Sequence, residues 1–400
     1  MEWKEVRLGD VCSIQRGASP RPIQKFISKE GMPWVKIADA TGISSRYISS
    51  TSEYIIKEGI SKSRIVHPGD LIVSNSATPG LPKFMAIEAC VHDGWLIIRD
   101  LDGIDKVFLY YVFINIRRRL SNQANGSVFM NLKTDIVKDF VIKLPTLDDQ
   151  RRIASILSSL DQKIELNNKI NADLEEMAQA IFKNWFVDFE PFKDGKFMDS
   201  ELGMIPEGWK VGTLGDFCKC LLGGTPSRSK EEYWNGDVNW INSGEINKFR
   251  ILEASEKITE LGLSKSATKL LPKKTTVLAI TGATLGQVSL LEIDTCANQS
   301  VIGVLENAEV PYEYIYPFIK DRIEMLIQHQ TGGAQQHINK DNVESLIFLL
   351  PAKNVLENYI SLVGPMYKRI ESQCFENLYL STLRDTLLPR LMSGELEVPE

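Results

Sequence analysis

Hydrophobic residues recur at heptad spacing in two long stretches of the chain. Between residues 149 and 186, apolar side chains fill most of positions 153, 160, 167, 174 and 181 and of positions 157, 164, 171, 178 and 185. A seam of about five heptads predicts one long helix that packs against a partner helix. The same positions shifted by 206 residues carry a second seam, from Tyr359 to Leu391. At about 1.5 Å per residue, each helix is on the order of 55 Å long.

Both seams are interrupted by polar residues at the same step, Asn167 and Asn171 in the first and Gln373 and Asn377 in the second. Buried amides in an apolar seam cost stability unless they are paired, and they can fix the register of two helices. If the helices run antiparallel, these polar layers lie near both midpoints and can face each other. The alternative is that the amides sit at the edge of the seam and meet water.

The region before each seam is also repeated in the sequence. Residues of the first copy recur at an offset of 206: Trp3-Lys4, Leu8-Gly9-Asp10, Cys12, Gly17, Trp34, Cys90 and Leu144-Pro145 match Trp209-Lys210, Leu214-Gly215-Asp216, Cys218, Gly223, Trp240, Cys296 and Leu350-Pro351. Residues 59–63 match residues 262–266 at an offset of 203, so small insertions occur and are compensated. A period of this length indicates a duplicated structural unit.

Within each copy, short strands and one helix alternate with clusters of Gly, Pro, Ser and Asn. Residues 71–74, 95–98 and 140–144 predict buried strands, and residues 107–120 predict a helix. We therefore expect an α+β protein with two similar mixed α/β domains, at residues 1–145 and 207–350, related by a pseudo-two-fold internal repeat. Spacer helices at 146–187 and 351–400 would pack as an antiparallel coiled coil, with a Pro-, Gly- and charge-rich linker at 188–206.

Composition narrows the class of protein. The chain has 400 residues, 43% hydrophobic and 24% charged, with a net charge of −6. Lysine and arginine exceed acidic residues in 1–145, by 20 to 15, but not in the rest of the chain, so bulk charge alone would not hold nucleic acid. The absence of a long apolar run or a signal-peptide pattern, and six scattered cysteines, lead us to expect a cytoplasmic protein.

Motifs for catalysis are scarce. The sequence has no Gly-rich phosphate loop with a lysine, no Asn-Pro-Pro-Tyr-type motif, and only four histidines, none at zinc-binding spacing. Residues 281–286 predict a tight turn after a strand at 277–280, and Cys218 and Cys220 are better explained by core packing. We therefore expect a binding protein with no catalytic residue, no metal site and no cofactor of its own.

Candidate nucleic-acid-binding residues lie in the predicted loops of both domains. They are polar or basic types that reach base edges and phosphates, although each could instead be a solvated turn former. The first domain offers Ser19, Arg21, Lys25, Lys36, Arg46, Ser74, Asn75, Ser76, Lys83, Asn125, Asn131 and Lys133. The second offers Thr225, Arg228, Lys230, Asn242, Ser243, Lys248, Thr281, Thr284, Gln287, Asn298, Gln335, Gln336 and Asn339.

Several short segments together resemble the specificity subunits of type I restriction–modification systems. They are Trp3–Asp10, Ser200–Trp209, Trp34, Trp240, Pro68–Val73, Leu144-Pro145 and Leu387–Leu396, and the resemblance covers nearly the whole chain. It implies two target-recognition domains that each read half of a bipartite double-stranded DNA sequence, with two helices that set the gap. It also implies two modification subunits that use S-adenosylmethionine and two restriction subunits that use ATP and magnesium, and no catalysis by this chain.

The two copies differ at their loops. The first has His92-Asp93-Gly94 where the second has Asn298-Gln299-Ser300, and it has Phe129 and Met130 where the second has Gln335 and Gln336. Two other classes stay open on the sequence. One is a coiled-coil adaptor whose two domains bind proteins. The other is a nuclease-like enzyme, for which Asp39/Glu245 and Asp10/Asp216 are the best matched acids, although Asp10 and Asp216 are better explained as helix caps.

Overall fold

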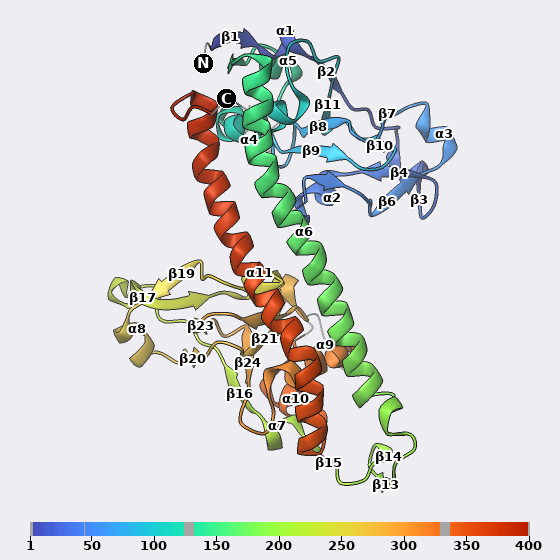
Figure 1. Cartoon of the computed structure of the whole chain (residues 1–400), viewed down its shortest axis with the longest axis vertical. Helices are drawn as coiled ribbons and strands as arrows, with labels where there is room; N and C mark the ends of the chain where they lie inside the picture. The colour runs from blue at the N-terminus through green and yellow to red at the C-terminus, as the bar shows by residue number, and fades with distance from the viewer. Residues whose placement is uncertain (1–2, 44, 124–131, 329–336, 399–400) are drawn as a thin grey trace. The chain divides into compact units, whose positions relative to one another are not determined.

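The chain folds into two compact units, each built from a mixed α/β domain and part of both long helices (Figure 1). The computed structural model describes residues 3–43, 45–123, 132–328 and 337–398. The first unit comprises residues 1–165 and 378–400, and the second comprises residues 166–377. Among the described residues, no helix is both long enough and apolar enough to cross a membrane.

The first unit contains two five-stranded sheets, ordered β3-β6-β4-β10-β7 and β2-β11-β8-β9-β5, and a separate pair β1-β12. Its elements are β1 (Lys4–Arg7), α1 (Leu8–Val11), β2 (Ser13–Arg16), η1 (Ile23–Lys25), β3 (Ile27–Ser28), β4 (Met32–Val35), α2 (Ile37–Thr41), β5 (Tyr47–Ile48), β6 (Glu53–Ile55), α3 (Lys57–Ile60), β7 (Arg64–Val66), β8 (Leu71–Ser74), β9 (Pro82–Met85), β10 (Ala89–Val91), β11 (Trp95–Arg99), α4 (Lys106–Gln123), α5 (Thr134–Lys138) and β12 (Val141–Leu144).

The second unit repeats this plan with sheets β16-β24-β21-β22-β18 and β19-β17-β23-β20 and the pair β15-β25. Its elements are η2 (Glu190–Phe192), β13 (Phe197–Ser200), β14 (Gly203–Pro206), β15 (Lys210–Thr213), α7 (Leu214–Phe217), β16 (Lys219–Leu222), η3 (Glu231–Tyr233), β17 (Trp234–Ile241), η4 (Ser243–Asn247), β18 (Arg250–Ile251), β19 (Glu256–Ile258), α8 (Glu260–Ser264), β20 (Leu270–Leu271), β21 (Thr276–Ala279), η5 (Gly282–Thr284), β22 (Val288–Leu291), β23 (Thr295–Ala297), β24 (Val301–Leu305), α9 (Tyr312–Gln328), α10 (Lys340–Glu344) and β25 (Ile347–Leu350).

The predicted duplication is confirmed strand by strand. The order β2-β11-β8-β9-β5 in the first unit corresponds to the order β16-β24-β21-β22-β18 in the second. The other sheet has five strands in the first unit and four in the second, where β3 has no counterpart. The ladders also locate an insertion. Ser74 pairs with Trp95, whereas Ala279 pairs with Val301, so the offset is 205 residues in this strand and 206 in its neighbour. The loop after β21 is therefore one residue longer than the loop after β8.

Both predicted long helices are present. Helix α6 (Leu147–Phe186) begins where Thr146 exchanges hydrogen bonds with Asp149, which is the N-terminal capping arrangement that satisfies a free backbone amide. Helix α11 (Lys353–Ser393) is the second. In the first unit the start of α6 shares a core with the end of α11, and in the second unit Trp185 of α6 contacts Tyr359 of α11 with ring centroids 6.0 Å apart. The two helices are thus antiparallel within each unit.

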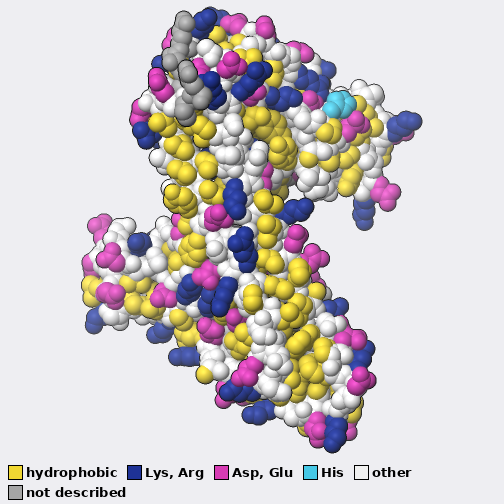
Figure 2. Space-filling view, in the orientation of Figure 1, with side chains coloured by type: hydrophobic (Ala, Val, Ile, Leu, Met, Phe, Trp, Pro, Cys, Tyr) yellow, Lys and Arg dark blue, Asp and Glu magenta, His cyan; other side chains and the backbone are white. Residues whose placement is uncertain are grey.

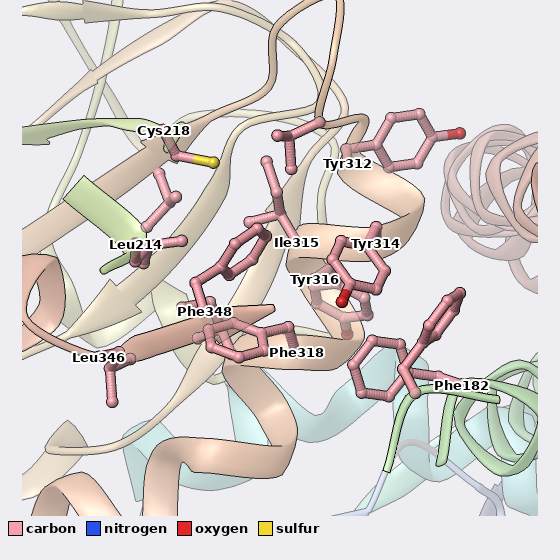
Figure 3. Close-up of a cluster of buried hydrophobic side chains, with 14 of the residues drawn as sticks. Phe182, Leu214, Cys218, Tyr312, Tyr314, Ile315, Tyr316, Phe318, Leu346 and Phe348 are labelled. Carbon is pink, nitrogen blue, oxygen red and sulfur yellow. The ribbon is translucent and has the colours of Figure 1, made fainter. Parts of the chain in front are cut away.

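The strict heptad seam holds only in part. Ile153, Leu157 and Ala178 are buried as predicted, but near the end of the helix Phe182 and Phe186 are buried, whereas Ile181 and Trp185 are only partly buried. A straight helix has 3.6 residues per turn, so its buried face drifts away from a 3.5-residue repeat. The drift turns Phe182 and Phe186 toward the domain core, where both rings contact Tyr314. Figure 3 shows Phe182 and Tyr314 in this core.

The polar layers face each other rather than water. Asn167 donates to the side-chain oxygens of Asn377, at 2.9 Å, and Glu376, at 2.8 Å, and it accepts from Gln373 at 3.0 Å. Asn171 donates to the sulfur of Cys374 at 3.6 Å. Asn167, Asn171 and Gln373 are almost completely buried. The antiparallel interpretation of these amides is confirmed within the second unit.

The segment predicted as a linker, 188–206, is ordered structure. It forms the hairpin β13–β14, and Phe189 and Phe192 pack on Trp209 with ring centroids 5.6 and 5.1 Å apart. In the first unit the segment after α11 packs in a similar way: Val398 is buried in the core that Trp3 contacts. Glycine is required there: Gly394 has a φ of +77°, and a Cβ at this position would lie 2.5 Å from the indole nitrogen of Trp3.

Gly394→Ala should destabilise the first unit through two effects, a left-handed backbone and a collision with Trp3. Gly69→Ala is the matched control in the same unit, because Gly69 also has a positive φ but open space around it. We expect Gly394→Ala to cost about 1–3 kcal/mol more than the control, measured by hydrogen exchange of the first unit. Equal losses for both variants would show that the contact with Trp3 is unimportant.

Asn167→Ala should destabilise the second unit by about 1–3 kcal/mol, because it leaves the buried amide of Gln373 without its acceptor. The control is Asn168→Ala, which removes an exposed amide that accepts from Asn377 at 2.8 Å and should cost less than about 1 kcal/mol. Hydrogen exchange localises the effect, since a two-unit chain need not unfold in one step. If Asn167→Ala destabilises the second unit no more than Asn168→Ala does, the result would contradict a layer of buried, paired amides.

Candidate nucleic-acid interface

Two segments of each domain meet at the same place in the fold. In the first unit, the loop after β2 meets the turn between β10 and β11: the Gly17 amide donates to the Trp95 carbonyl at 2.8 Å and the Ala18 amide donates to the Val91 carbonyl at 3.2 Å. In the second unit, Gly223 donates to Val301 at 3.0 Å and Gly224 donates to Ala297 at 2.8 Å. We call residues 17–21 with 91–95, and residues 223–227 with 297–301, the two loop–turn sites.

Glycine permits this approach. A Cβ on Gly17 would lie 2.2 Å from the carbonyl oxygen of His92, and a Cβ on Gly223 would lie 2.2 Å from the carbonyl oxygen of Asn298. Any larger residue would push the loop away from the turn. The matched glycines that the repeat brings out in the sequence are therefore explained by one close backbone contact, made once in each domain.

Side chains brace the two sites in the same way but with different chemistry. Ser19 donates its hydroxyl to Oδ1 of Asp93 at 2.6 Å, and Thr225 donates to Oε1 of Gln299 at 2.5 Å. The turn itself is also closed by matched groups. Nδ1 of His92 accepts from the Gly94 amide at 2.7 Å, and Oδ1 of Asn298 accepts from the Ser300 amide at 3.1 Å.

The first loop–turn site carries charge. Nη2 of Arg21 lies 3.4 Å from Oδ2 of Asp93 and Nη2 of Arg16 lies 3.6 Å from it, while Nε of Arg16 donates to the Asp93 carbonyl at 2.8 Å. Burial raises the pKa of Asp93, but the Ser19 hydroxyl and the Arg16 charge outweigh it and hold that pKa below its ordinary value. A cleft of about 1090 Å³ adjoins the site and is lined by residues that include Arg21, Trp34 and Lys36.

The second domain holds its arginine differently. Arg228 lies over the ring of Trp234, 3.6 Å from its centroid, and pairs with both carboxylate oxygens of Glu256. The hydrogen bond that Arg228 donates to Glu256 raises the pKa of Arg228. Stacking and a bidentate carboxylate fix the plane of a guanidinium, so Arg228 is held rigidly at the surface. Lys230 nearby donates to the Tyr233 hydroxyl at 3.0 Å.

Four residues predicted to contact nucleic acid point into the first domain instead. Arg46 is buried and donates to both oxygens of Glu165, at 3.0 Å each, and the amine of buried Lys83 donates to the carbonyls of Ile43 and Ser45. Burial lowers the pKa of Lys83 to about 8. Ser74 and Asn75 are also buried. Their side chains hold the loops in place and are not presented to a ligand.

Other predicted residues serve as caps or lie at the surface. The side chains of Asn242 and Asn339 accept backbone amides at the starts of η4 and α10, and Lys36 pairs with Glu53 at 2.7 Å. Lys25, Lys133, Lys248 and Gln287 are exposed, and Ser76, Ser243, Thr281 and Thr284 are half-buried. Asn125, Asn131, Gln335 and Gln336 lie outside the described residues. On the face in Figure 2, lysine and arginine are interspersed with acidic side chains.

One buried cation was not found from the sequence. Arg250, 4% exposed, donates to Glu175 of α6 at 2.7 Å, and Lys320 reaches the other oxygen of Glu175 at 2.9 Å. Together with Arg46–Glu165, this contact ties each domain to α6 inside its own unit. The available signal was an acidic residue on the inward side of a long amphipathic helix, where a lone charge would be costly.

The chain matches the family described as type I restriction modification DNA specificity domain over residues 1–176 and 206–358. It belongs to that family. It is 27% identical to the type I restriction enzyme MjaIX specificity subunit of Methanocaldococcus jannaschii, covering 100% of this chain and 94% of that protein. It is 24% identical to the HindI specificity subunit of Haemophilus influenzae, covering 99% and 100%.

A solved structure shares the fold of this specificity subunit. The crystal structure of a type I restriction–modification S subunit from M. genitalium superposes with a TM-score of 0.59 at 15% identity, covering 98% of this chain and 96% of that one. The resemblance seen in the sequence is therefore confirmed at the level of family and fold. The two halves of this family member carry different side chains at their loop–turn sites.

Three of the four matched acids of this specificity subunit act as caps. Asp39 accepts from the Lys36 amide at 2.8 Å and from the Ser52 hydroxyl at 2.8 Å, and Glu245 accepts from the Asn242 amide and the Ser255 hydroxyl at 3.2 and 2.7 Å. Asp216 caps α7 through Thr213, whereas Asp10 makes no such cap in α1. The described residues contain no group of three or more His, Cys, Asp or Glu that could hold a metal.

Acidification should loosen the first loop–turn site. Burial lowers the pKa of His92 despite Asp93 and Asp39, with Lys36 and Arg16 adding to the effect, so the folded state binds its proton less well than the unfolded state. This stability is present above the ordinary histidine pKa of about 6.5 and is lost as pH falls below it, by at most about 1.4 kcal/mol per pH unit.

His92→Asn tests this directly, because Asn298 closes the same turn in the second domain. The protection factors of residues 91–95, which correct for the intrinsic pH dependence of hydrogen exchange, should fall between pH 7 and pH 5 in the original protein but not in the variant. The matched turn at 297–301 is an internal control that should not respond. Equal pH dependence in both proteins would exclude His92 as the titrating group.

Proposed function

We propose that this chain reads a bipartite double-stranded DNA target, with one short block contacted by each domain. The observation that carries the proposal is the pair of loop–turn sites, which share a backbone geometry but differ in side chains. A duplicated scaffold with different contact residues suits one protein that recognises two different sequences. Sequence reading needs polar groups at base edges, and both sites present such groups at the surface.

The two long helices would set the gap between the blocks. Their buried amide layer supports a fixed register, because sliding one helix along the other would leave the amides of Asn167 and Gln373 unpaired. The family resemblance further suggests partners. We propose that the chain assembles with two adenine-methylating modification subunits and two ATP-dependent restriction subunits, in the cytoplasm, and that S-adenosylmethionine, ATP and magnesium bind to those partners.

The acidic net charge of −6 bears on affinity. Attraction to phosphate depends on the number of cations that displace counterions, and here several cations are paired with acids on the same surface. We therefore expect weak binding of DNA by the isolated chain at physiological salt and tighter binding in the presence of the modification subunit. Tight, sequence-specific binding by the chain alone would contradict this expectation.

Selection from a random DNA library tests the function. The chain with its purified modification subunit should enrich one asymmetric motif of two short blocks at a fixed gap. Matched heptad insertions in α6 and α11 should lengthen the gap and leave both blocks unchanged, whereas an insertion in α6 alone should abolish enrichment. Failure of the unaltered complex to enrich any motif would contradict DNA reading and favour an adaptor that binds proteins.

A further inference from the structure

We propose that residues 93 and 299 are paired specificity-determining positions: Asp93 holds Arg16 and Arg21 as a guanine-reading pair, and Gln299 presents its amide to adenine. The inference rests on the proposed DNA-reading function and deepens it. Asp93 was not among the DNA contacts predicted from the sequence.

The shared contact explains why both positions need an acceptor. Ser19 and Thr225 each donate a hydroxyl to the side chain at position 93 or 299 and so pin the loop to the turn. An amide oxygen performs this task in the second domain. A neutral residue would therefore also serve in the first domain, and the charge of Asp93 needs a separate explanation.

The arginines supply that explanation. Both approach Oδ2 of Asp93, the oxygen that Ser19 does not use. In the second domain the residues at the matching positions are Leu222 and Ser227, which carry no charge. The acid is present where the two cations are present and is replaced by an amide where they are absent. Asp93, Arg16 and Arg21 thus occur together in the first domain and act as one unit.

The arrangement leaves donors available. The Arg21 side chain is 80% exposed although its Nη2 faces Asp93, so its remaining N–H groups are open to a ligand. Surface ion pairs of this kind contribute little to stability, which points away from a purely structural role. Arginine reads guanine through O6 and N7 with two parallel hydrogen bonds, and a carboxylate that limits its motion reduces the entropy lost on binding.

The second site offers a different donor. Oε1 of Gln299 accepts from Thr225, and its amide nitrogen has no protein partner among the described residues. The residue is exposed. A glutamine amide can donate to N7 and accept from N6 of adenine, which is the pairing that suits a neutral side chain in the major groove. The two loop–turn sites thus share one backbone geometry, and each would present a side chain to a different base.

The experiment is motif selection with the complex of the chain and its modification subunit. Asp93→Asn keeps an acceptor for Ser19 and removes the charge, so the fold should be retained. We expect the preference for guanine at one position of one block to fall about 10-fold, with the other block unchanged. Arg21→Lys keeps the positive charge but loses the bidentate hydrogen-bond donor. It should lower the preference for guanine at the same position.

The reciprocal variant and a control complete the design. Gln299→Glu should lower the preference for adenine in the other block only. Lys57→Ala removes an exposed cation of the first domain outside the site and should change neither block. The proposal is overturned if Asp93→Asn leaves the preference for guanine intact. It is also overturned if either variant lowers the base preferences of both blocks together. A motif from the unaltered complex with no effect of Asp93→Asn refutes this inference alone, whereas no motif at all refutes the proposed function as well.

Discussion

A single backbone contact, made once in each half of the chain, positions the surface on which the proposed recognition depends. Gly17 lies against the carbonyl of His92 and Gly223 lies against the carbonyl of Asn298, so a loop and a turn from different parts of the sequence form one surface. The contact involves main-chain atoms and does not constrain the exposed side chains. The side chains of this surface can therefore differ while the scaffold stays constant, as they do between the two halves of this molecule.

Buried and partly buried ion pairs complete the framework. In the first unit Arg46 reaches Glu165 and Arg384 reaches Asp161, and in the second unit Arg250 reaches Glu175 and Lys274 reaches Glu371. Each domain is thereby connected to α6, and charged contacts also involve α11. A buried pair is not strongly stabilising by itself, but breaking one partner is costly. These contacts restrict how each domain can sit on the helices of its own unit.

The sequence predicted the repeated elements well because strand and helix periodicity depend on local spacing. Strand 71–74 has the predicted bounds, and the helix predicted at 107–120 extends from Lys106 to Gln123. Burial was harder to predict. Arg46 and Lys83 look like surface cations in the sequence, since only the fold brings Glu165 and the carbonyl groups of residues 43 and 45 to them. The hairpin at 197–206 was missed because Gly, Pro and charge predict a loop.

Photo-crosslinking would show which part of the DNA each loop–turn site contacts. A photoreactive residue placed at exposed Gln24, beside the first loop–turn site, or at exposed Ser229, beside the second, reports what each surface touches in the complex with the modification subunit and target DNA. The account predicts crosslinks from position 24 to one block and from position 229 to the other. Crosslinks from both positions to the same block, or crosslinks only to protein, would contradict it.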